Sequence, residues 1–117
     1  MEQSFEKGSS IPLTEPTYFI LLSLCHAPRH GYAIMKEVRW LSDERVILST
    51  GTLYSALKRL LDLGWILRRE DPESNHNGRI RKFYSLSPIG RNVLKTEIQR
   101  LENLVYAAHL CPLEEVT

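Results

Sequence analysis

Long apolar runs are absent from this chain of 117 residues. The longest, from Tyr18 to Cys25, is interrupted by Ser23 and is far shorter than the roughly 20 residues that cross a bilayer. The first ten residues, MEQSFEKGSS, lack the charged and then apolar order of a secretion signal. We therefore expect a cytoplasmic protein with no membrane partner.

Cysteine is also scarce. Cys25 and Cys111 are too few for a disulfide framework, which fits a reducing compartment. The neighbouring pairs Cys25–His26 and His109–Cys111 match no spacing of known metal ligands. We predict no metal and no cofactor.

Catalytic patterns are missing as well. The sequence shows no Ser/His/Asp arrangement, no paired carboxylates and no glycine-rich phosphate loop. His30 could act as a sensor or as a ligand, but we expect it to cap the helix that begins at Gly31. We therefore do not predict an enzyme.

The net charge of the whole chain is close to zero, but cations and anions are unevenly distributed along it. The whole chain carries +1, whereas residues 58–100 hold ten cations and five anions. The net charge of this segment is therefore +5, and that of the rest of the chain is −4. A basic half indicates an anionic partner, although a solvated surface of mixed charge is the simpler alternative.

The length and the 43% hydrophobic content predict one globular domain with a single core. A first helix should follow Thr14 and end before Pro28, and a second should run over residues 30–41. A third should begin near Ser49 and end near Gly64, with Leu53, Leu57, Leu60 and Leu61 facing inward.

The second half of the chain predicts a hairpin and a fourth helix. Two β-prone runs flank a turn-rich segment containing Asn77-Gly78, which indicates a hairpin with a long tip. Ser87-Pro88 begins a long helix that reaches about His109.

This order predicts an α+β, mainly α fold: a winged helix-turn-helix with three helices, a two-stranded hairpin wing and a long C-terminal dimerisation helix. We divide the chain into a flexible arm (1–14), a DNA-binding domain (15–87), the dimerisation helix (88–110) and a tail (111–117).

The start of the third helix is unusual, since hydroxyls and a glycine precede its first leucine. Free backbone N–H groups and the helix dipole attract phosphate there, and glycine permits close approach. Hydroxyls, phenols and cations bind phosphates or base edges. An ordinary Ser/Thr cap is the alternative. The candidate DNA contacts on this helix are Thr50, Gly51, Thr52, Tyr54, Ser55, Lys58 and Arg59.

The hairpin carries a second group of cations. Arg79, Arg81 and Lys82 lie near its tip, and Arg68 and Arg69 lie on its first strand. A wing lies beside the recognition helix, so both groups of cations should face the same nucleic acid. A solvated charged hairpin is the simpler alternative. We predict Arg79, Arg81 and Lys82 as DNA contacts.

Three separated motifs carry a family resemblance. HGYAIMKEV, TGTLYSALKRLLDLGWI and GRIRKFYSLSPIGRNVL resemble, in order and spacing, the PadR family of bacterial transcriptional regulators, over about Glu15 to Leu101. The resemblance implies a dimeric DNA-binding repressor. The resemblance also implies that DNA is contacted by Thr52, Tyr54 and Lys58 in the third helix and by Arg79 and Lys82 in the wing.

The sequence departs from the family pattern at several positions. Ser55 stands where proline is common, Leu61 and Leu63 where polar residues are usual, and Ser87 where threonine is common. Some members bind flat aromatic drugs between paired tryptophans of the last helix. This last helix has no tryptophan, so that binding mode is not expected.

The last helix has the spacing of a pairing helix. Its apolar positions recur in steps of four and three, as in a coiled-coil seam. The first helix carries more apolar residues than one buried stripe needs, although a last helix that folds back on its own domain is the alternative. The predicted dimer interface comprises Tyr18, Phe19, Leu22, Leu94, Ile98, Leu101, Val105 and Ala108.

Together these observations predict a sequence-specific, ligand-responsive repressor that binds double-stranded DNA as a homodimer on an inverted repeat. A small-molecule effector would lie where the dimer helices meet. Two alternatives remain at this point: a winged-helix module that docks an acidic protein, and a small-molecule sensor whose DNA binding is secondary.

Overall fold

The computed structural model describes residues 12–76 and 79–113, without the side chains of 74–76 and 79. Most of the expected arm and the last four residues of the expected tail therefore lie outside the described residues. The described residues form four helices and one three-stranded antiparallel sheet. This confirms the α+β, mainly helical winged helix-turn-helix fold. In chain order the elements are α1 (Glu15–Ser23), β1 (Arg29–His30), α2 (Gly31–Leu41), α3 (Thr50–Asp62), β2 (Ile66–His76), β3 (Arg79–Leu86) and α4 (Pro88–Ala108).

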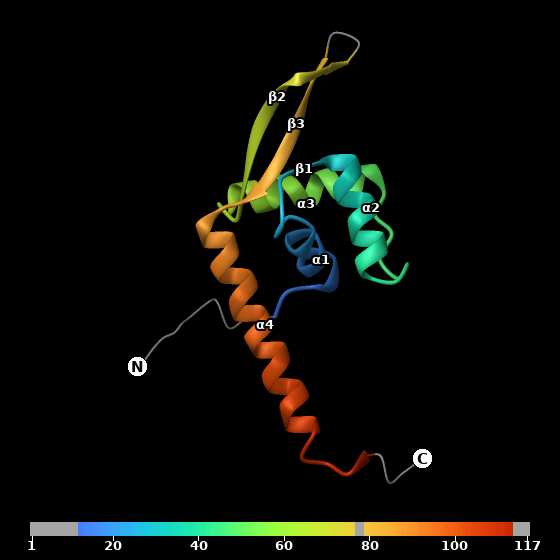
Figure 1. Cartoon of the computed structure of the whole chain (residues 1–117), viewed down its shortest axis with the longest axis vertical. Helices are drawn as coiled ribbons and strands as arrows, with labels where there is room; N and C mark the ends of the chain where they lie inside the picture. Colours follow the sequence, from blue (N-terminus) through green and yellow to red (C-terminus); the bar gives the residue numbers. More distant parts are fainter. Residues whose placement is uncertain (1–11, 77–78, 114–117) are drawn as a thin grey trace.

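The wing and α4 leave the body at opposite ends (Figure 1). The helices α1, α2 and α3 form the body, and α3 lies beneath the base of the wing. The central core residues are fully buried and come from all three body helices. The largest of those on the three helices are Ile20, Leu21, Ile34, Val38, Leu53, Leu57 and Leu60, and Leu24 and Ile66 add to them from outside the helices.

Helix α1 begins as predicted and ends earlier than predicted. The Oγ1 atom of Thr14 accepts a hydrogen bond from the amide of Thr17 at 3.3 Å. The helix stops at Ser23, five residues before Pro28, because the Ser23 hydroxyl donates back to the carbonyl of Ile20. The Arg29 side chain then donates to the Ser23 carbonyl at 2.5 Å and replaces the next helical amide.

The sheet has one strand that the sequence did not reveal, and a longer hairpin than expected. β1 pairs with β3, placing His30 opposite Phe83, so the strand order is β1-β3-β2. The prediction of a long tip is wrong, because pairing continues to His76 opposite Arg79. An irregularity between Asp71 and Asn75 accommodates the Pro-containing segment inside β2.

The root of α4 is fixed to the turn that follows α3. Ser87 caps α4 by accepting from the Gly90 amide at 2.9 Å, and its hydroxyl donates to the Gly64 carbonyl at 2.6 Å. Gly64 has φ of 77°, a value that favours glycine. A Cβ at Gly90 would lie 1.9 Å from the backbone oxygen of Trp65. The backbones meet so closely here that only glycine fits.

None of the described helices is long and apolar enough to span a membrane.

Candidate nucleic-acid interface

The first turn of α3 presents small polar groups to the surface. Ser49 caps the helix: its Oγ accepts from the Thr52 amide at 3.2 Å, and the two hydroxyls lie 2.9 Å apart. The amides of Thr50 and Gly51 have no acceptor within the helix, as at any helix start. A Cβ on Gly51 would meet nothing within 4 Å, so this glycine faces open space. The turn is thus both a normal cap and an accessible set of donors.

The rest of α3 has a buried surface and an outward surface. Leu53, Leu57 and Leu60 are buried in the core as predicted. Ser55 and Lys58 are exposed on the outward surface, where the Lys58 ammonium lies 3.6 Å from Asp62. An exposed pair of this kind is weak and leaves the lysine available for a stronger anion.

A groove of about 570 Å³ separates α3 from the wing. Tyr54 and Lys58 line it from α3, while Arg68 and Tyr84 line it from the strands. Arg68 lies close enough to Tyr84 to lower the pKa of its phenol, and both side chains line the α3 side of the wing. The sequence indicates Arg68 only as part of the charge of the wing. Side chains alternate along a strand, so its position two residues after the buried Ile66 is the signal that it faces α3.

The two tyrosines of this groove are close enough to influence each other. Burial raises the pKa of Tyr84, and nearby Tyr54 raises it further, whereas Arg68 acts in the opposite direction. Tyr84 is therefore a neutral phenol at neutral pH. It serves to support Arg68 and is not an ionised group.

Tyr54 lies on the border between the buried and the outward surfaces of α3. A Cβ placed on Gly31 would lie 2.4 Å from the Tyr54 hydroxyl oxygen, so the phenol lies over the start of α2. The side chain remains 46% exposed, which leaves one edge of the ring open to a ligand. The glycine of the His-Gly-Tyr motif thus makes room for the tyrosine of the Gly-Thr-Leu-Tyr motif.

Arg59 lies away from the wing, in a cleft that it shares with Gly51, Thr52 and Ser55. Its guanidinium donates to the Thr17 hydroxyl on α1 at 3.1 Å. One residue along a helix is a turn of about 100°, so Arg59 faces α1 whereas Lys58 faces outward and toward the wing. The arrangement does not support Arg59 as a partner of the wing cations.

The wing cations are balanced by carboxylates across the ribbon. Lys82 lies opposite Glu70 and Arg81 opposite Asp71, and both cations are exposed. They border a cleft of about 290 Å³ that also includes His30 and Tyr54. The Arg79 side chain is outside the described residues, so its predicted contact stays a prediction.

A comparison of sequences decides the family. The profile of the Transcriptional regulator PadR-like family matches residues 20–96, about two thirds of the chain. The chain belongs to the PadR-like family. The resemblance drawn from its three motifs is confirmed, and the family is one of transcriptional regulators rather than enzymes.

Several solved PadR-like structures are similar to this chain. A PadR family transcription regulator from Clostridium difficile has a TM-score of 0.69 and 27% identity, covering 83% of this chain and 97% of that one. A transcriptional regulator from Clostridium thermocellum has a TM-score of 0.66 and 26% identity, with 81% and 90% covered. Bacillus subtilis PadR, solved in complex with operator DNA, has a TM-score of 0.59 and 25% identity, with 68% and 44% covered.

One curated relative is also similar. An uncharacterized transposon protein of Streptomyces fradiae is 35% identical over 85 residues, which is 73% of this chain. The matched region is 22% of that protein, so this PadR-like chain spans less than a quarter of the relative's length.

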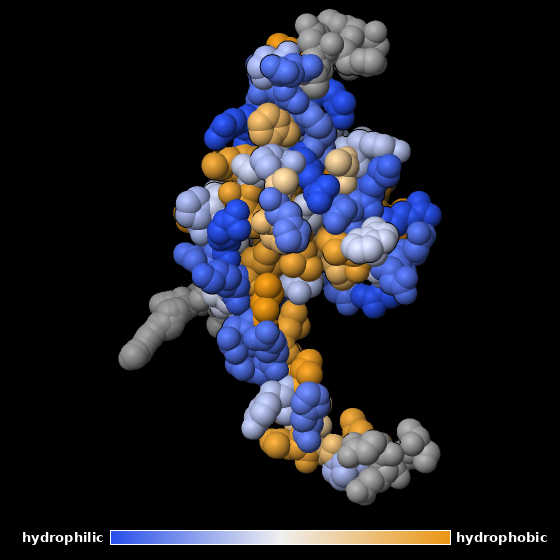
Figure 2. Space-filling view, viewed as in Figure 1, coloured by the Kyte–Doolittle hydropathy of each residue, from blue (hydrophilic) through white to orange (hydrophobic). Residues whose placement is uncertain are grey.

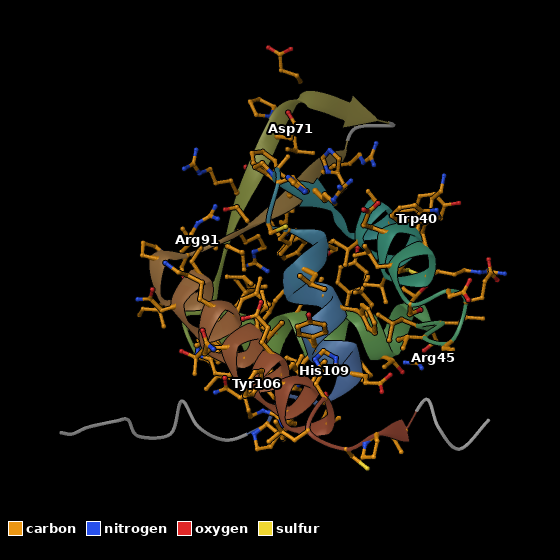
Figure 3. The ribbon with its side chains drawn as sticks, turned by 60° about the horizontal axis from the view of Figure 1, so that its bottom comes forward. Trp40, Arg45, Asp71, Arg91, Tyr106 and His109 are labelled. Atoms are coloured by element: carbon orange, nitrogen blue, oxygen red, sulfur yellow. The ribbon has the colours of Figure 1, made fainter. Side chains whose placement is uncertain are left out.

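A second, apolar surface of this PadR-like chain lies along α1 and α4. A groove of about 350 Å³ is lined by Tyr18 from α1, by Ile98, Leu101, Glu102, Val105 and Tyr106 from α4, and by His109 directly after α4. Figure 2 shows apolar side chains gathered along α4, and Figure 3 shows Tyr106 and His109 at its distal end. Tyr18 and Phe19 pack edge to face with their ring centres 5.5 Å apart.

The predicted dimer residues differ in how much they are exposed. Leu94 is buried in its own protomer at 5% exposure, so a place in a dimer interface is not supported for it. Tyr18, Phe19, Leu22, Ile98 and Leu101 are half-buried, whereas Val105 and Ala108 are exposed. Tyr106, at 67% exposure, was not in the predicted set, because it falls outside the steps of four and three.

A buried charge pair marks the place where α4 leaves the body. Glu97 is 4% exposed and accepts two hydrogen bonds from the Arg100 guanidinium, at 2.9 and 2.7 Å. These bonds lower the pKa of Glu97 despite its burial. The Leu13 amide lies 3.4 Å from the same carboxylate, so the pair also holds the residues that lead into α1.

Proposed function

We propose that this PadR-like chain is a transcriptional repressor that binds an inverted-repeat operator as a homodimer in the cytoplasm and is released by a small molecule. The observation that carries the DNA-binding part is the groove between α3 and the wing. It gathers Tyr54, Lys58 and Arg68 on one surface, and the exposed first turn of the same helix adds free amides and hydroxyls in a neighbouring cleft. Bacillus subtilis PadR, whose structure includes operator DNA, supports the same use of this fold.

The homodimer is supported by the apolar surface of α1 and α4. The distal half of α4 extends beyond the body (Figure 1) and exposes apolar side chains that a monomer would leave in water. Pairing through these helices around a twofold axis would set two α3 helices about one DNA turn, roughly 34 Å, apart. An operator that suits such a dimer is an inverted repeat.

Release by a small molecule is supported by a pocket that is partly open to solvent. A space of about 710 Å³ lies between α1, α3 and α4 and is lined mainly by apolar groups, with Arg59, Thr17 and Glu97 at its polar points. A ligand that fills it would press on the recognition helix and on the pairing helix at once. From the sequence we expect the effector where the helices of the dimer meet. We propose that it binds in this neighbouring pocket, which lies within one chain.

The test is selection of DNA from a random pool followed by titration at several salt concentrations. We expect one enriched inverted repeat, and an affinity that falls steeply with salt at a slope of about −0.9 per neutralised phosphate. A random duplex should bind more weakly by roughly 10³-fold or more.

The alternative is a winged-helix module that docks an acidic protein. Such a module would enrich no sequence, and its affinity for selected and random duplexes would be equal. That result would contradict the proposed function.

A further inference from the structure

His30 contacts both strands of the wing from the start of α2. Its Nδ1 atom lies 3.1 Å from the backbone oxygen of Lys82 on β3. Its Nε2 atom lies 3.3 Å from Oδ2 of Asp71 on β2. The ring also meets Phe83 edge to face, with the ring centres 6.1 Å apart. One side chain thus joins three elements at the base of the wing.

The expected helix-capping role of His30 is wrong. His30 occupies the N-cap position of α2, but its side chain makes no capping hydrogen bond. The ring is turned to the wing instead. Its position beside Gly31, over which Tyr54 lies, places this contact directly next to the recognition helix.

Both polar partners of the His30 ring are acceptors. A backbone carbonyl and a carboxylate only accept, and a neutral imidazole carries one N–H. The neutral ring therefore satisfies one partner at a time, whereas the imidazolium donates to both. Histidine changes charge between about pH 5 and 8, so the double contact is pH-dependent.

Other charged and titratable groups surround the ring and influence how strongly the protonated ring is held. The wing supplies the anion Asp71 and the cations Arg81 and Lys82, and the helices supply the phenols of Tyr32 and Tyr54. Arg29, the neighbour of His30 on β1, is directed elsewhere, toward Glu37 and the Ser23 carbonyl. Asp71 is the charged side chain with the shortest described contact to the ring, at 3.3 Å, so protonation of the ring strengthens the attachment of the wing.

We propose that His30 is a positioning residue that, when protonated, holds the wing against the start of α2 and thereby sets how Arg81 and Lys82 stand relative to α3. This proposal rests on the proposed DNA binding. The sign follows from the contacts: the imidazolium favours the attached wing, so attachment is full at low pH and is lost as the pH rises. Operator affinity should fall in the same direction.

The first measurement is operator affinity from pH 5.5 to 8.5 for the wild type, His30→Gln and the control His26→Gln, which changes an exposed histidine of the turn after α1. One linked proton changes affinity by at most about tenfold per pH unit. We expect the wild type and His26→Gln to lose roughly fivefold between pH 6 and 8, and His30→Gln to be flat across this range. A profile of His30→Gln that follows the wild type would overturn the proposal.

The second measurement needs no DNA. In NMR spectra of the free protein, the amides of Asp71 and Lys82 should titrate with the same midpoint as the His30 ring, and this titration should vanish in His30→Gln. If no DNA binds but these amides follow the ring, the proposed function fails and the wing attachment stands. If DNA binds but the amides do not follow the ring, the attachment proposal fails alone. A thermal melt confirms that each variant is folded.

Discussion

The two projections of this molecule, the wing and the distal half of α4, differ in the residues that they expose. The wing exposes Leu67 and Ile80, but mainly cations with carboxylates across the ribbon from them, and such a charged surface is stable in water by itself. The distal half of α4 and the residues after it expose Leu104, Val105, Tyr106, Leu110 and Leu113. An apolar surface of this kind needs a partner. The comparison indicates that one end meets a polyanion and the other a second copy of the chain.

The two ends also differ in how they are attached. α4 is joined to the body through contact between backbones, where Gly90 meets the Trp65 carbonyl. The wing is paired to the body through the backbones of β1 and β3, and its further contacts there are made by side chains, including His30. A joint between backbones is rigid, whereas a joint made by side chains can adjust. Each of the following changes tests one side of this contrast.

The largest expected effect comes from breaking the apolar end. Val105→Asp together with Tyr106→Asp should give monomers, because both side chains are mostly exposed in the protomer and are not needed for its own core. Operator affinity should fall by about a thousandfold, since joining two half-sites contributes roughly 10²–10⁴. Sedimentation and DNA titration measure both effects.

The control for this change is Asn103→Asp, which adds one charge at an exposed position of the same helix. It should remain a dimer with nearly unchanged affinity. A double variant that still sediments as a dimer would show that the pairing surface lies elsewhere.

The next effect compares the backbone joint of α4 with a side-chain contact inside the body, that of Tyr54 on α3 with Gly31 on α2. Gly90→Ala should lower the free energy of unfolding by about 2–4 kcal/mol, because the new Cβ meets backbone that cannot move freely. Gly31→Ala should cost about 1 kcal/mol or less, because the end of the Tyr54 side chain can shift. Gly51→Ala, which faces open space, is the control. Equal losses for Gly90→Ala and Gly31→Ala in denaturant titrations would remove the contrast between the backbone joint and the side-chain contact.

A third change tests the groove at the charged end. Lys58→Ala together with Arg68→Ala should lower the magnitude of the salt slope by roughly two, one for each lost phosphate contact. Arg59→Ala is the matched control, since it removes the adjacent cation of the same helix that faces α1. If Arg59→Ala changes the slope as much as the double variant, the assignment of the α3 surfaces is wrong.

The smallest expected effect comes from the wing. Arg81→Ala together with Lys82→Ala should weaken binding to operator and random DNA alike, by about tenfold, because these cations would contact phosphates and not bases. Their ratio should stay nearly constant. A collapse of the ratio with random binding intact would mean that the wing reads bases.

Much of the fold could be predicted from local patterns. The leucines of α3, the cap at Thr14 and the Ser87-Pro88 start all depend on neighbours within a few residues of the chain. β1 could not be predicted in the same way. It has two residues and is defined only by its pairing with β3, more than 50 residues later.

The candidate site was predictable by residue type more than by orientation. The helix wheel separates Lys58 from Arg59 but does not show that α1 lies beside Arg59 and supplies Thr17. The coiled-coil spacing includes Leu94 but cannot show that the body of the same protomer already covers it. The contact of Tyr54 with Gly31 joins two motifs whose relation appears only in three dimensions.

The measurement that tests the account most directly is the stoichiometry of the complex with a selected operator, by sedimentation of labelled duplex at low salt. The account predicts two chains on one inverted repeat, with half-site centres about 10 base pairs apart. It also predicts that a duplex with one half-site destroyed binds far more weakly. A single chain bound per duplex, with the same affinity for the intact and the half-destroyed site, would contradict the account.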